Sequence, residues 1–311
     1  MIEEGLVSVI ILSYRNLEGV FDTLQSVLNQ SYDLIEVIFA DDGSDGFDSV
    51  TDRIQAMVSG SRLKRTVIKH SPFNRGTVKN INEALQEANG EYIKLLASED
   101  QLSNTEAISD YVSYIRETDA PVVFARMIGI TPEGEYRKEL ISCESDYNLL
   151  KSYDLNQQRN RLFARNYLPA PAAFFQRKVF DQYGMFDEDV RLIEDYPYWL
   201  MLSEKGVKFI YLDKIEAVAR LSGVSSAGSY SESFMNDMNV IYRKYIFPKD
   251  RRYGVFQKPY NGLKRMGLRF YMEKARLPKY KGARRIVYYI LYWPFIMYTG
   301  WINWKNARKN Q

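Results

Sequence analysis

Two apolar runs in the first hundred residues each end abruptly in acidic residues, and this pattern constrains the fold most. Residues 34–40 lead into Asp-Asp-Gly-Ser at 41–44, and residues 92–97 lead into Ser-Glu-Asp at 98–100. Such runs are typical of strands covered on both faces in a parallel sheet, whose ligands bind beyond the carboxyl ends of the strands. Acids at those ends can bind a ribose hydroxyl, a base edge or a divalent cation that holds phosphates. The sequence therefore predicts a nucleotide site with a metal.

The first hundred residues alternate predicted strands with predicted helices. Uninterrupted apolar stretches predict the strands, and apolar residues at helical spacing predict the helices. The strands are expected at 7–12, 35–40, 66–69 and 92–96, and the helices at 17–28, 47–58 and 77–88. This alternation indicates βαβ units and an α/β fold with a mostly parallel sheet flanked by helices. Residues 103–106 have the spacing of a capping box, which predicts a helix reaching about residue 117.

The pattern changes after residue 120. A turn at 131–134 between two apolar stretches predicts an antiparallel hairpin, and residues 142–168 are polar and irregular, which indicates a loop with a helical piece. Further strands are expected at 172–176, 209–212 and 216–221, and helices at 179–183, 196–204 and 231–245. The sequence predicts a domain over 1–235, with a nucleotide half over about 1–120 and an acceptor half over about 121–235, and a helical extension over 236–311.

Cysteine, histidine and charge exclude several classes of protein. Cys143 is the single cysteine, so no intramolecular disulfide forms, and the lone His70 argues against a histidine zinc site or a Ser-His-Asp triad. The acidic N-terminus leads directly into a strand, so we expect no signal peptide. Residues 249–311 carry 16 Lys and Arg against 2 Asp and Glu, a balance of +14, whereas residues 1–248 carry −11. A basic tail on an acidic body predicts an anionic partner for the tail.

Four further segments offer candidate site residues, each with a simpler alternative. The first segment is Ser13-Tyr14-Arg15 at the end of the first strand, where Tyr14 can stack on a base and Arg15 can meet a phosphate. The alternative is that Asn16 caps the helix that follows. The acids at 41–42 bind a ligand or form an Asx turn. Residues 74–80 suit a diphosphate or a solvated helix start. The acids at 187–188, after Phe186, and at 194–195 bind a ligand, or the second pair caps the helix after it.

Six motifs follow one another along the chain. The first three are a strand ending in Ser-Tyr at 13–14, a strand ending in Asp-Asp-Gly-Ser at 41–44, and Asn-x-Gly with Lys-Asn at 74–80. The last three are Gly-Glu-Tyr-Ile at 90–93, which leads into an acidic strand end, Gly-x-Phe-Asp-Glu at 184–188, and Glu-Asp at 194–195. This series resembles the family 2 glycosyltransferases of GT-A fold over residues 7–226. Bacterial sugar transferases for O-antigen and capsule are most similar. The resemblance implies an inverting enzyme that moves a sugar from a nucleotide donor, expected to be a UDP-sugar, to a hydroxyl of a polyprenyl-diphosphate-linked glycan.

The resemblance also implies a role for each matching residue. Tyr14 stacks on the uracil, Asp42 hydrogen-bonds it, and Ser13 and Arg15 belong to the same donor site. Asp100 binds Mn²⁺ or Mg²⁺, and Glu99 faces the ribose or donor sugar. The remaining assignments are Lys79 near the diphosphate, Asp195 as the catalytic base, and Arg220 with 222–225 in a loop that closes over the diphosphate. Relatives usually have Asp where this chain has Glu99, another acid at Ala97, and often His at Ser222, so a second hypothesis is a catalytically weak scaffold that binds nucleotide-sugar or polysaccharide.

The basic tail contains residues 286–304, an uncharged stretch rich in Tyr and Trp with cations on both sides. Aromatic residues with flanking cations suit the headgroup layer of a membrane, which predicts a cytoplasmic protein held peripherally on the inner face of the cell membrane. A membrane span, a buried helix and a homodimer contact are the alternatives. Nucleic acid is excluded, because the aromatic residues form one block and do not alternate with the cations.

Overall fold

The computed structural model describes residues 2–131, 135–137, 144–220, 231–246, 248, 270 and 280–309 of the 311-residue chain. Its contacts divide the chain into two compact units, Met1–Gly223 and Val224–Gln311. The sequence analysis places the boundary after residue 235, so the two divisions differ by one short segment.

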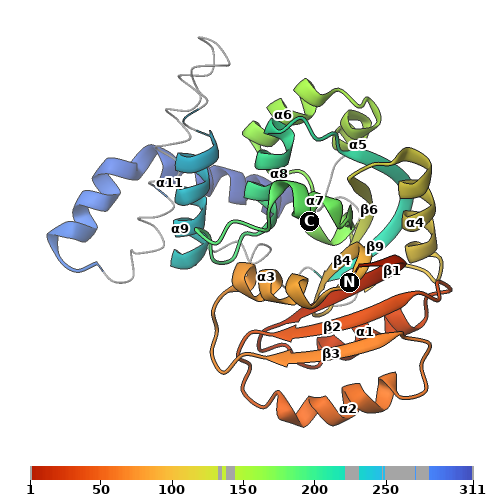
Figure 1. The fold of residues 1–311 in the computed structure, drawn as a ribbon. Helices are drawn as coiled ribbons and strands as arrows, with labels where there is room; N and C mark the ends of the chain where they lie inside the picture. The colour runs from red at the N-terminus through yellow and green to blue at the C-terminus, as the bar shows by residue number, and fades with distance from the viewer. Residues whose placement is uncertain are drawn as a thin grey trace. The chain divides into compact units, whose positions relative to one another are not determined.

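In the described part of the first unit, nine strands form one sheet in the order β3-β2-β1-β4-β8-β6-β9-β5, with β7 paired to β6 (Figure 1). The strands are β1 (Glu3–Ser13), β2 (Ile35–Asp41), β3 (Arg65–His70), β4 (Gly90–Ala97), β5 (Gln101–Leu102), β6 (Val122–Ile130), β7 (Tyr136–Arg137), β8 (Ala173–Gln176) and β9 (Ile210–Arg220).

Strand direction changes at the middle of this sheet. The pairs β3–β2, β2–β1 and β1–β4 are all parallel, as the alternating sequence pattern predicts. Beyond β4, β8 runs antiparallel to both β4 and β6, while β6 and β9 are parallel. The prediction of a mostly parallel sheet is therefore right for the first half and wrong for the second half, where the sheet is mixed. The reversal is made by β8, which runs against both of its neighbours. Separately, β6 and β7 pair antiparallel, which confirms the predicted hairpin over its described residues.

Eight α-helices lie in the described part of the first unit. They are α1 (Gly19–Leu28), α2 (Asp48–Val58), α3 (Thr77–Glu87), α4 (Ala107–Thr118), α5 (Glu144–Lys151), α6 (Leu155–Ala164), α7 (Lys178–Tyr183) and α8 (Asp195–Glu204). Helices α1, α2 and α4 bury their apolar side chains against one face of the sheet, in a core that includes Val9, Val37 and Phe174. The neighbouring strand residue Phe175 points to the opposite face and stacks with Trp199 of α8, 5.6 Å between ring centroids. The sheet is thus covered on both faces, which explains its uninterrupted apolar strands.

Three local predictions differ from the structure. The hydroxyl of Ser103 donates to the backbone of Ile215, and the backbone N–H of Glu106 donates to the side chain of Asn104 at 2.8 Å, so the predicted capping box does not form. The two short strands expected at 209–212 and 216–221 are one strand, β9. The loop expected at 142–168 contains two helices, α5 and α6. Long-range contacts account for the first two differences, through the bond of Ser103 to Ile215 and the pairing of β9 with β6.

The second unit contains α9 (Glu232–Ile241), which continues as a π-helix over Tyr242–Ile246, and α11 (Ala283–Lys309). One side of α11 packs on Phe270 and Tyr280, through Tyr288, Tyr292, Phe295 and Ile296. The predicted helical character of the extension is confirmed for these residues. Across the part of the chain that the structure describes, no helix combines the length and apolar character needed to cross a membrane.

Candidate active site

The parallel strands bring four predicted motifs to one edge of the sheet. The loops that follow β1, β2, β3 and β4 all leave this edge and are joined to one another by backbone hydrogen bonds. Asp42 N donates to Ser13 O at 2.9 Å, Ser71 N donates to Asp41 O at 3.0 Å, and Ser98 N donates to Leu12 O at 2.7 Å. The carboxyl edge of the sheet is therefore an ordered platform on which the candidate side chains stand.

Asp41 is the centre of a buried hydrogen-bond network. Its Oδ1 accepts from the hydroxyls of Ser13 at 2.8 Å and Ser44 at 2.5 Å, and its Oδ2 accepts from Ser44 N at 2.8 Å. The ring nitrogen Nδ1 of His70 lies 2.8 Å from the same Oδ2. Asp41 and Ser13 are both almost completely buried. Ser13, expected to contact the donor, therefore supports the site from beneath through Asp41.

Asp42 organises the loop that follows β3. Its Oδ1 accepts the backbone N–H of Arg75 and its Oδ2 accepts that of Gly76, both at 2.8 Å. Gly43 has a φ of +79° and lies against the backbone of Phe73, where a Cβ atom would be 2.5 Å from the carbonyl carbon. Only glycine fits this position. Each Asp42 oxygen keeps a second lone pair, so the carboxylate can accept a further hydrogen bond.

Tyr14 and Arg15 stand at the open side of this platform. Tyr14 is 40% exposed, and the Arg15 guanidinium lies 4.9 Å from the centroid of the Tyr14 ring. Arg15 has a left-handed backbone with φ of +65°, and its N–H donates to the hydroxyl of Ser44 at 2.7 Å. A non-glycine residue held in this conformation is typical of a functional loop. The exposed aromatic face of Tyr14 is suited to stack on a planar ligand.

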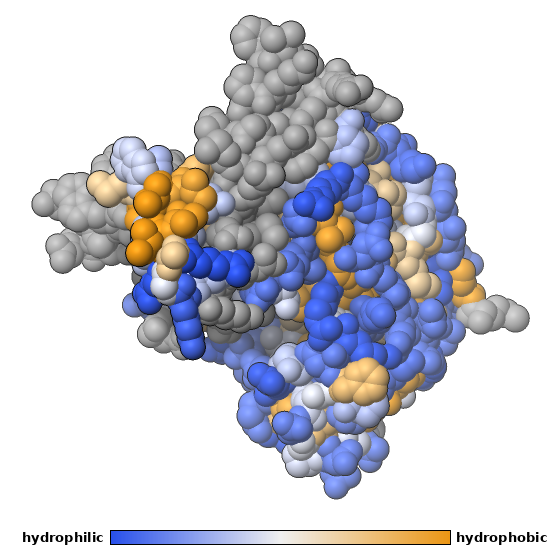
Figure 2. Space-filling view, turned by 90° about the vertical axis from the view of Figure 1, so that its left-hand side faces the viewer, coloured by the Kyte–Doolittle hydropathy of each residue, from blue (hydrophilic) through white to orange (hydrophobic). Residues whose placement is uncertain are grey.

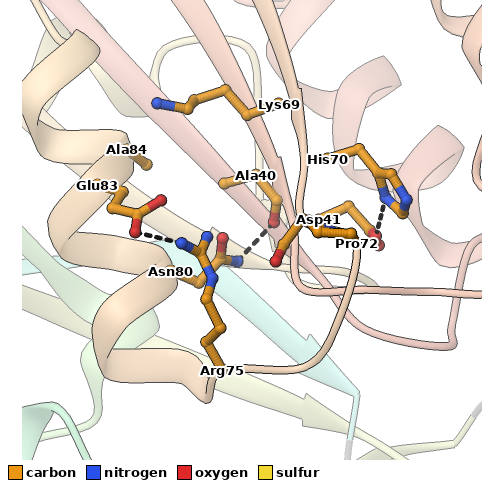
Figure 3. A pocket seen from close by; sticks show the side chains of 10 residues that line it. Ala40, Asp41, Lys69, His70, Pro72, Arg75, Asn80, Glu83 and Ala84 are labelled. Carbon is orange, nitrogen blue, oxygen red and sulfur yellow. Dashed lines mark hydrogen bonds and ion pairs between the residues drawn. The ribbon is translucent and has the colours of Figure 1, made fainter.

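A cavity of about 150 Å³ lies between α3 and the ends of β2 and β3. Figure 3 shows Asn80 donating to the backbone of Ala40, the ion pair of Arg75 with Glu83, and His70 against Asp41. The cavity is lined by Ala40, Asp41, Lys69, His70, Ser71, Pro72, Arg75, Asn80, Glu83 and Ala84. Lys79, predicted near the diphosphate, is exposed on α3 and is not one of these lining residues.

The acidic end of β4 carries Glu99 and Asp100. Glu99 has a φ of +80°, and its N–H donates to the Thr23 hydroxyl at 3.0 Å. Asp100 is 8% exposed, and its Oδ2 accepts the backbone N–H of Ala97 at 3.1 Å. Burial raises the pKa of Asp100 to about 7, although the positive charge of the buried Lys94 acts in the opposite direction. A cation bound beside Asp100 would lower this raised pKa and favour the ionised carboxylate.

Strand β9 brings Arg220 to the same place. β9 pairs with β5, which follows directly after Asp100, in the register Gln101↔Val218. As a result Arg220 Nε lies 3.4 Å from Glu99 Oε1. The loop at 222–225, expected to close over the diphosphate, lies outside the described residues, but the strand that leads into it ends beside the acidic motif.

Glu194 and Asp195 lie at the start of α8, both half-buried. Asp195 Oδ2 accepts a hydrogen bond from Asn166 Nδ2 at 2.9 Å, and its Oδ1 accepts from the N–H of Tyr196 at 2.6 Å. Burial raises the pKa of Asp195, and burial together with the charges of Asp195 and Asp100 raises the pKa of Glu194 to about 8. The negative charge of Asp100 thus reaches Glu194, so the acidic end of β4 lies within electrostatic range of the start of α8. The nearby motif at 186–188 has a structural contact, because Asn82 Nδ2 donates to Phe186 O at 2.9 Å.

A metal at this site would depend on few protein ligands. Within the described residues, no group of three or more His, Cys, Asp or Glu side chains could hold a metal ion. Mg²⁺ commonly binds one or two carboxylates and completes its shell with waters and substrate phosphates. A buried hard-oxygen donor such as Asp100, with Arg220 close by, fits a cation held jointly by the protein and a diphosphate.

The fold and site together define the class of this protein. The open sheet with helices on both faces, acids at the carboxyl ends of β2 and β4, and a further acid on α8 are the arrangement of a GT-A glycosyltransferase. Residues 8–184 match the family model for glycosyl transferase family 2. This chain belongs to that family, and glycosyltransferase activity follows from its membership.

Individual relatives are similar to this chain over most of its length, at low identity. An Escherichia coli protein, UDP-Glc:alpha-D-GlcNAc-diphosphoundecaprenol beta-1,3-glucosyltransferase WfaP, is 25% identical over 83% of this chain and 94% of its own length. Staphylococcus aureus TarS 1-349 in complex with UDP-GlcNAc has a TM-score of 0.58 at 20% identity, over 76% of this chain and 66% of that chain. The mannosyltransferase PcManGT from Pyrobaculum calidifontis, in complex with GDP-Man and Mn²⁺, has a TM-score of 0.58 at 17% identity over 96% of this chain and 83% of its own.

Sequence reasoning missed several residues that the site uses. Asn166 hydrogen-bonds the candidate base, His70 contacts Asp41, and Lys94 lies wholly buried near Asp100. None of these has a local signal, apart from Lys94, which is an unusual cation inside an apolar strand. The position of Lys94 within the apolar run 92–97 was thus the one clue in the sequence, and in the structure its ammonium donates to the carbonyl of Ala173 at 3.1 Å.

Proposed function

We propose that this protein transfers a sugar with inversion from a UDP-sugar to a hydroxyl of a lipid-linked glycan, in the synthesis of a bacterial surface polysaccharide. The observations that carry this proposal are the acids at the carboxyl ends of two parallel strands, Asp42 after β2 and Asp100 after β4, and the effect of the Asp100 charge on Glu194, the neighbour of Asp195. The printed activity of the WfaP relative supports the lipid-linked acceptor, and the UDP-GlcNAc complex of TarS supports the donor class.

The donor site is proposed at the exits of β1, β2 and β4. Tyr14 stacks on the uracil, and Asp42 uses its remaining lone pairs to accept from the base, while Arg15 lies close enough to meet a phosphate. Asp100 holds Mn²⁺ or Mg²⁺ together with the diphosphate, with Glu99 toward the ribose or sugar. A divalent cation supplies charge stabilisation to the departing diphosphate. Lys79 and Arg220 add positive charge from α3 and β9.

Asp195 is proposed as the catalytic base. Proton removal from the acceptor hydroxyl needs one carboxylate on the side of the sugar opposite the leaving group, and a single displacement of this kind inverts the anomeric carbon. Both Asp195 oxygens already accept one hydrogen bond each, so the carboxylate has a fixed orientation and free lone pairs. The leaving diphosphate needs no protein acid, because cations absorb its charge.

We further propose that α11 attaches the enzyme to the inner face of the cell membrane. The side of α11 opposite its packed aromatic residues exposes Ile286, Val287, Ile290, Leu291, Trp293 and Met297, each at least 50% exposed. Figure 2 shows these first turns of the helix as a hydrophobic patch with hydrophilic side chains beside it. Arg284 and Arg285 precede the patch. An exposed apolar face next to cations fits a monolayer of anionic lipid, which is where a polyprenyl-linked acceptor also lies.

One assay tests the proposal directly. The full chain is incubated with Mn²⁺, a panel of UDP- and GDP-sugars and an undecaprenyl-diphosphate-linked GlcNAc, and products are followed by mass spectrometry. Transfer from a UDP-sugar with inverted configuration supports the proposal. If UDP binds but no donor is transferred or hydrolysed, the chain is the nucleotide-sugar-binding scaffold instead. Transfer only from GDP-sugars would overturn the assignment of Tyr14 and Asp42 to uracil. The predicted homodimer stays a prediction, which light scattering of the same sample tests.

A further inference from the structure

Asn166 lies between α6 and the short 3-10 helix at Ala170–Ala172, and its side chain contacts Asp195. Its Nδ2 donates to Asp195 Oδ2 at 2.9 Å, and its Oδ1 accepts the backbone N–H of Leu168 at 3.3 Å. An amide oxygen only accepts and an amide nitrogen only donates. The Leu168 N–H therefore fixes the direction of the amide, so that its donor end faces the carboxylate.

The segment that carries Asn166 is tied to the helix that carries Asp195. Trp199 Nε1 donates to Leu168 O at 3.0 Å, and the Tyr196 hydroxyl donates to Leu162 O at 2.7 Å. Both donors lie on α8, within five residues of Asp195, and Trp199 is completely buried. Asn166 and Asp195 are thus held by one rigid piece of structure, which a contact between two mobile loops would not achieve.

We propose that Asn166 is a positioning residue for Asp195, which holds the carboxylate in the orientation that takes the proton of the acceptor hydroxyl. The inference rests on the proposed role of Asp195 as the base. With Oδ2 bonded to Asn166 and Oδ1 bonded to the Tyr196 N–H, rotation of the carboxylate is blocked at both oxygens. A base held in this way needs no reorientation when the acceptor binds.

The charges around Asp195 add to this role. Glu194 precedes Asp195 at the start of α8, and the negative charge of Asp100 raises the pKa of Glu194. Arg165, next to Asn166, is paired with Asp146. Burial raises the pKa of Asp195, and the hydrogen bond from Asn166 is the largest effect that lowers it. Loss of this bond therefore raises the pKa of Asp195, because the ionised form loses a donor.

The test compares Asn166→Ala and Asn166→Asp with Gln158→Ala as a control. Gln158 lies on the neighbouring helix α6, and its side chain bonds only the backbone of Phe209 among its described contacts, at 3.1 Å and 3.4 Å. In the full-length protein, ¹³C NMR of labelled aspartate follows the titration of Asp195, which the spectrum of Asp195→Asn assigns. This readout needs no substrate. The same proteins are then assayed with the active donor and undecaprenyl-diphosphate-linked GlcNAc.

Asn166→Ala is expected to raise the pKa of Asp195 by about one unit. It is also expected to lower kcat by about 10- to 100-fold while KM for the donor stays within about twofold, because orientation of the base affects only the chemical step. Asn166→Asp has nearly the same shape and adds a second carboxyl group, so it is expected to shift the acid limb of the pH–rate profile further upward. Gln158→Ala is expected to lower thermal stability and leave the Asp195 titration unchanged.

An unchanged Asp195 titration in both Asn166 variants, or a kcat within twofold of the parent, would overturn the positioning role. If Asn166→Ala does not fold, the isosteric Asn166→Asp decides the question. Full turnover by Asp195→Asn would instead refute the proposed base. An inactive Asp195→Asn beside a fully active Asn166→Ala would refute only the inference about Asn166.

Discussion

Arg220 Nε lies 3.4 Å from Glu99 Oε1, so the last residue of β9 contacts the acidic motif that ends β4. The two residues are far apart in the sequence and are joined through the pairing of β9 with β5. Gly19 permits this arrangement, because a Cβ atom there would lie 2.3 Å from Glu99 Cγ. Glu99 thus neutralises the positive charge of Arg220, the residue proposed to meet the diphosphate.

The first prediction concerns this pair. Arg220→Ala is expected to weaken UDP binding by about tenfold, because a charge-assisted contact to the diphosphate is lost. Glu99→Asp is expected to be tolerated or to improve turnover, since Asp adopts a left-handed backbone more readily than Glu and is the usual residue in relatives. Isothermal titration calorimetry with UDP and Mn²⁺ measures the first effect. Arg62→Ala is a matched control, because its guanidinium pairs with Asp33 at 2.7 Å, just before the amino end of β2. UDP affinity unchanged in Arg220→Ala would show that Arg220 does not meet the diphosphate.

The second prediction concerns the metal. Asp100→Ala is expected to abolish turnover and the Mn²⁺-dependent part of UDP binding, because no group of three metal-binding side chains surrounds it among the described residues. Calorimetry with UDP, with and without Mn²⁺, separates the metal-dependent part from the rest. Asp110→Ala is a matched control, because Asp110 lies on α4 and pairs with Lys214 of β9 at 2.7 Å. Equal Mn²⁺–UDP affinity in the parent and Asp100→Ala would contradict the ligand assignment.

The third prediction concerns the base and pH. Asp195→Asn is expected to keep donor binding and to lower turnover by about 10²-fold or more. Only the ionised base accepts a proton, and burial raises the pKa of Asp195, so the rate is expected to rise with pH through a value above the ordinary aspartate pKa of about 3.9. The pH dependence of kcat/KM measures this limb. A rate that is flat down to pH 4 would contradict a base with a raised pKa. Near-normal kcat in Asp195→Asn would move the base to Glu194 or Asp187.

The fourth prediction concerns α11. The double change Ile290→Glu with Trp293→Glu is expected to release the protein from anionic liposomes, because both side chains lie on the exposed apolar face at 66% and 62% exposure. Truncation after Pro248 should have the same effect. Sedimentation with vesicles that contain phosphatidylglycerol measures binding, and high salt is expected to weaken it only in part, since insertion is not screened. Parent protein that ignores such vesicles at low salt would identify the exposed face as a packing or dimerisation surface.

The sequence by itself determined the parallel half of the sheet and its ligand-binding edge. Uninterrupted apolar strands ending in acid, with helices of regular spacing between them, admit few arrangements other than βαβ units. The exits of β1, β2 and β4 therefore meet at one edge, and this holds whatever the surrounding loops do. The placement of Tyr14, Asp42 and Asp100 on that edge required only local periodicity.

Tertiary structure decided which side chains support the site and which face it. Ser13 turns inward to Asp41, and Arg220 reaches Glu99 through a sheet pairing that no local pattern encodes. Asn166 lies in a stretch predicted as a loop, and becomes a partner of Asp195 because α6 packs on α8. Local sequence fixes backbone preference and burial, whereas a contact between distant segments depends on how whole helices pack. That is why the strands were predictable and the partners of the candidate base were not.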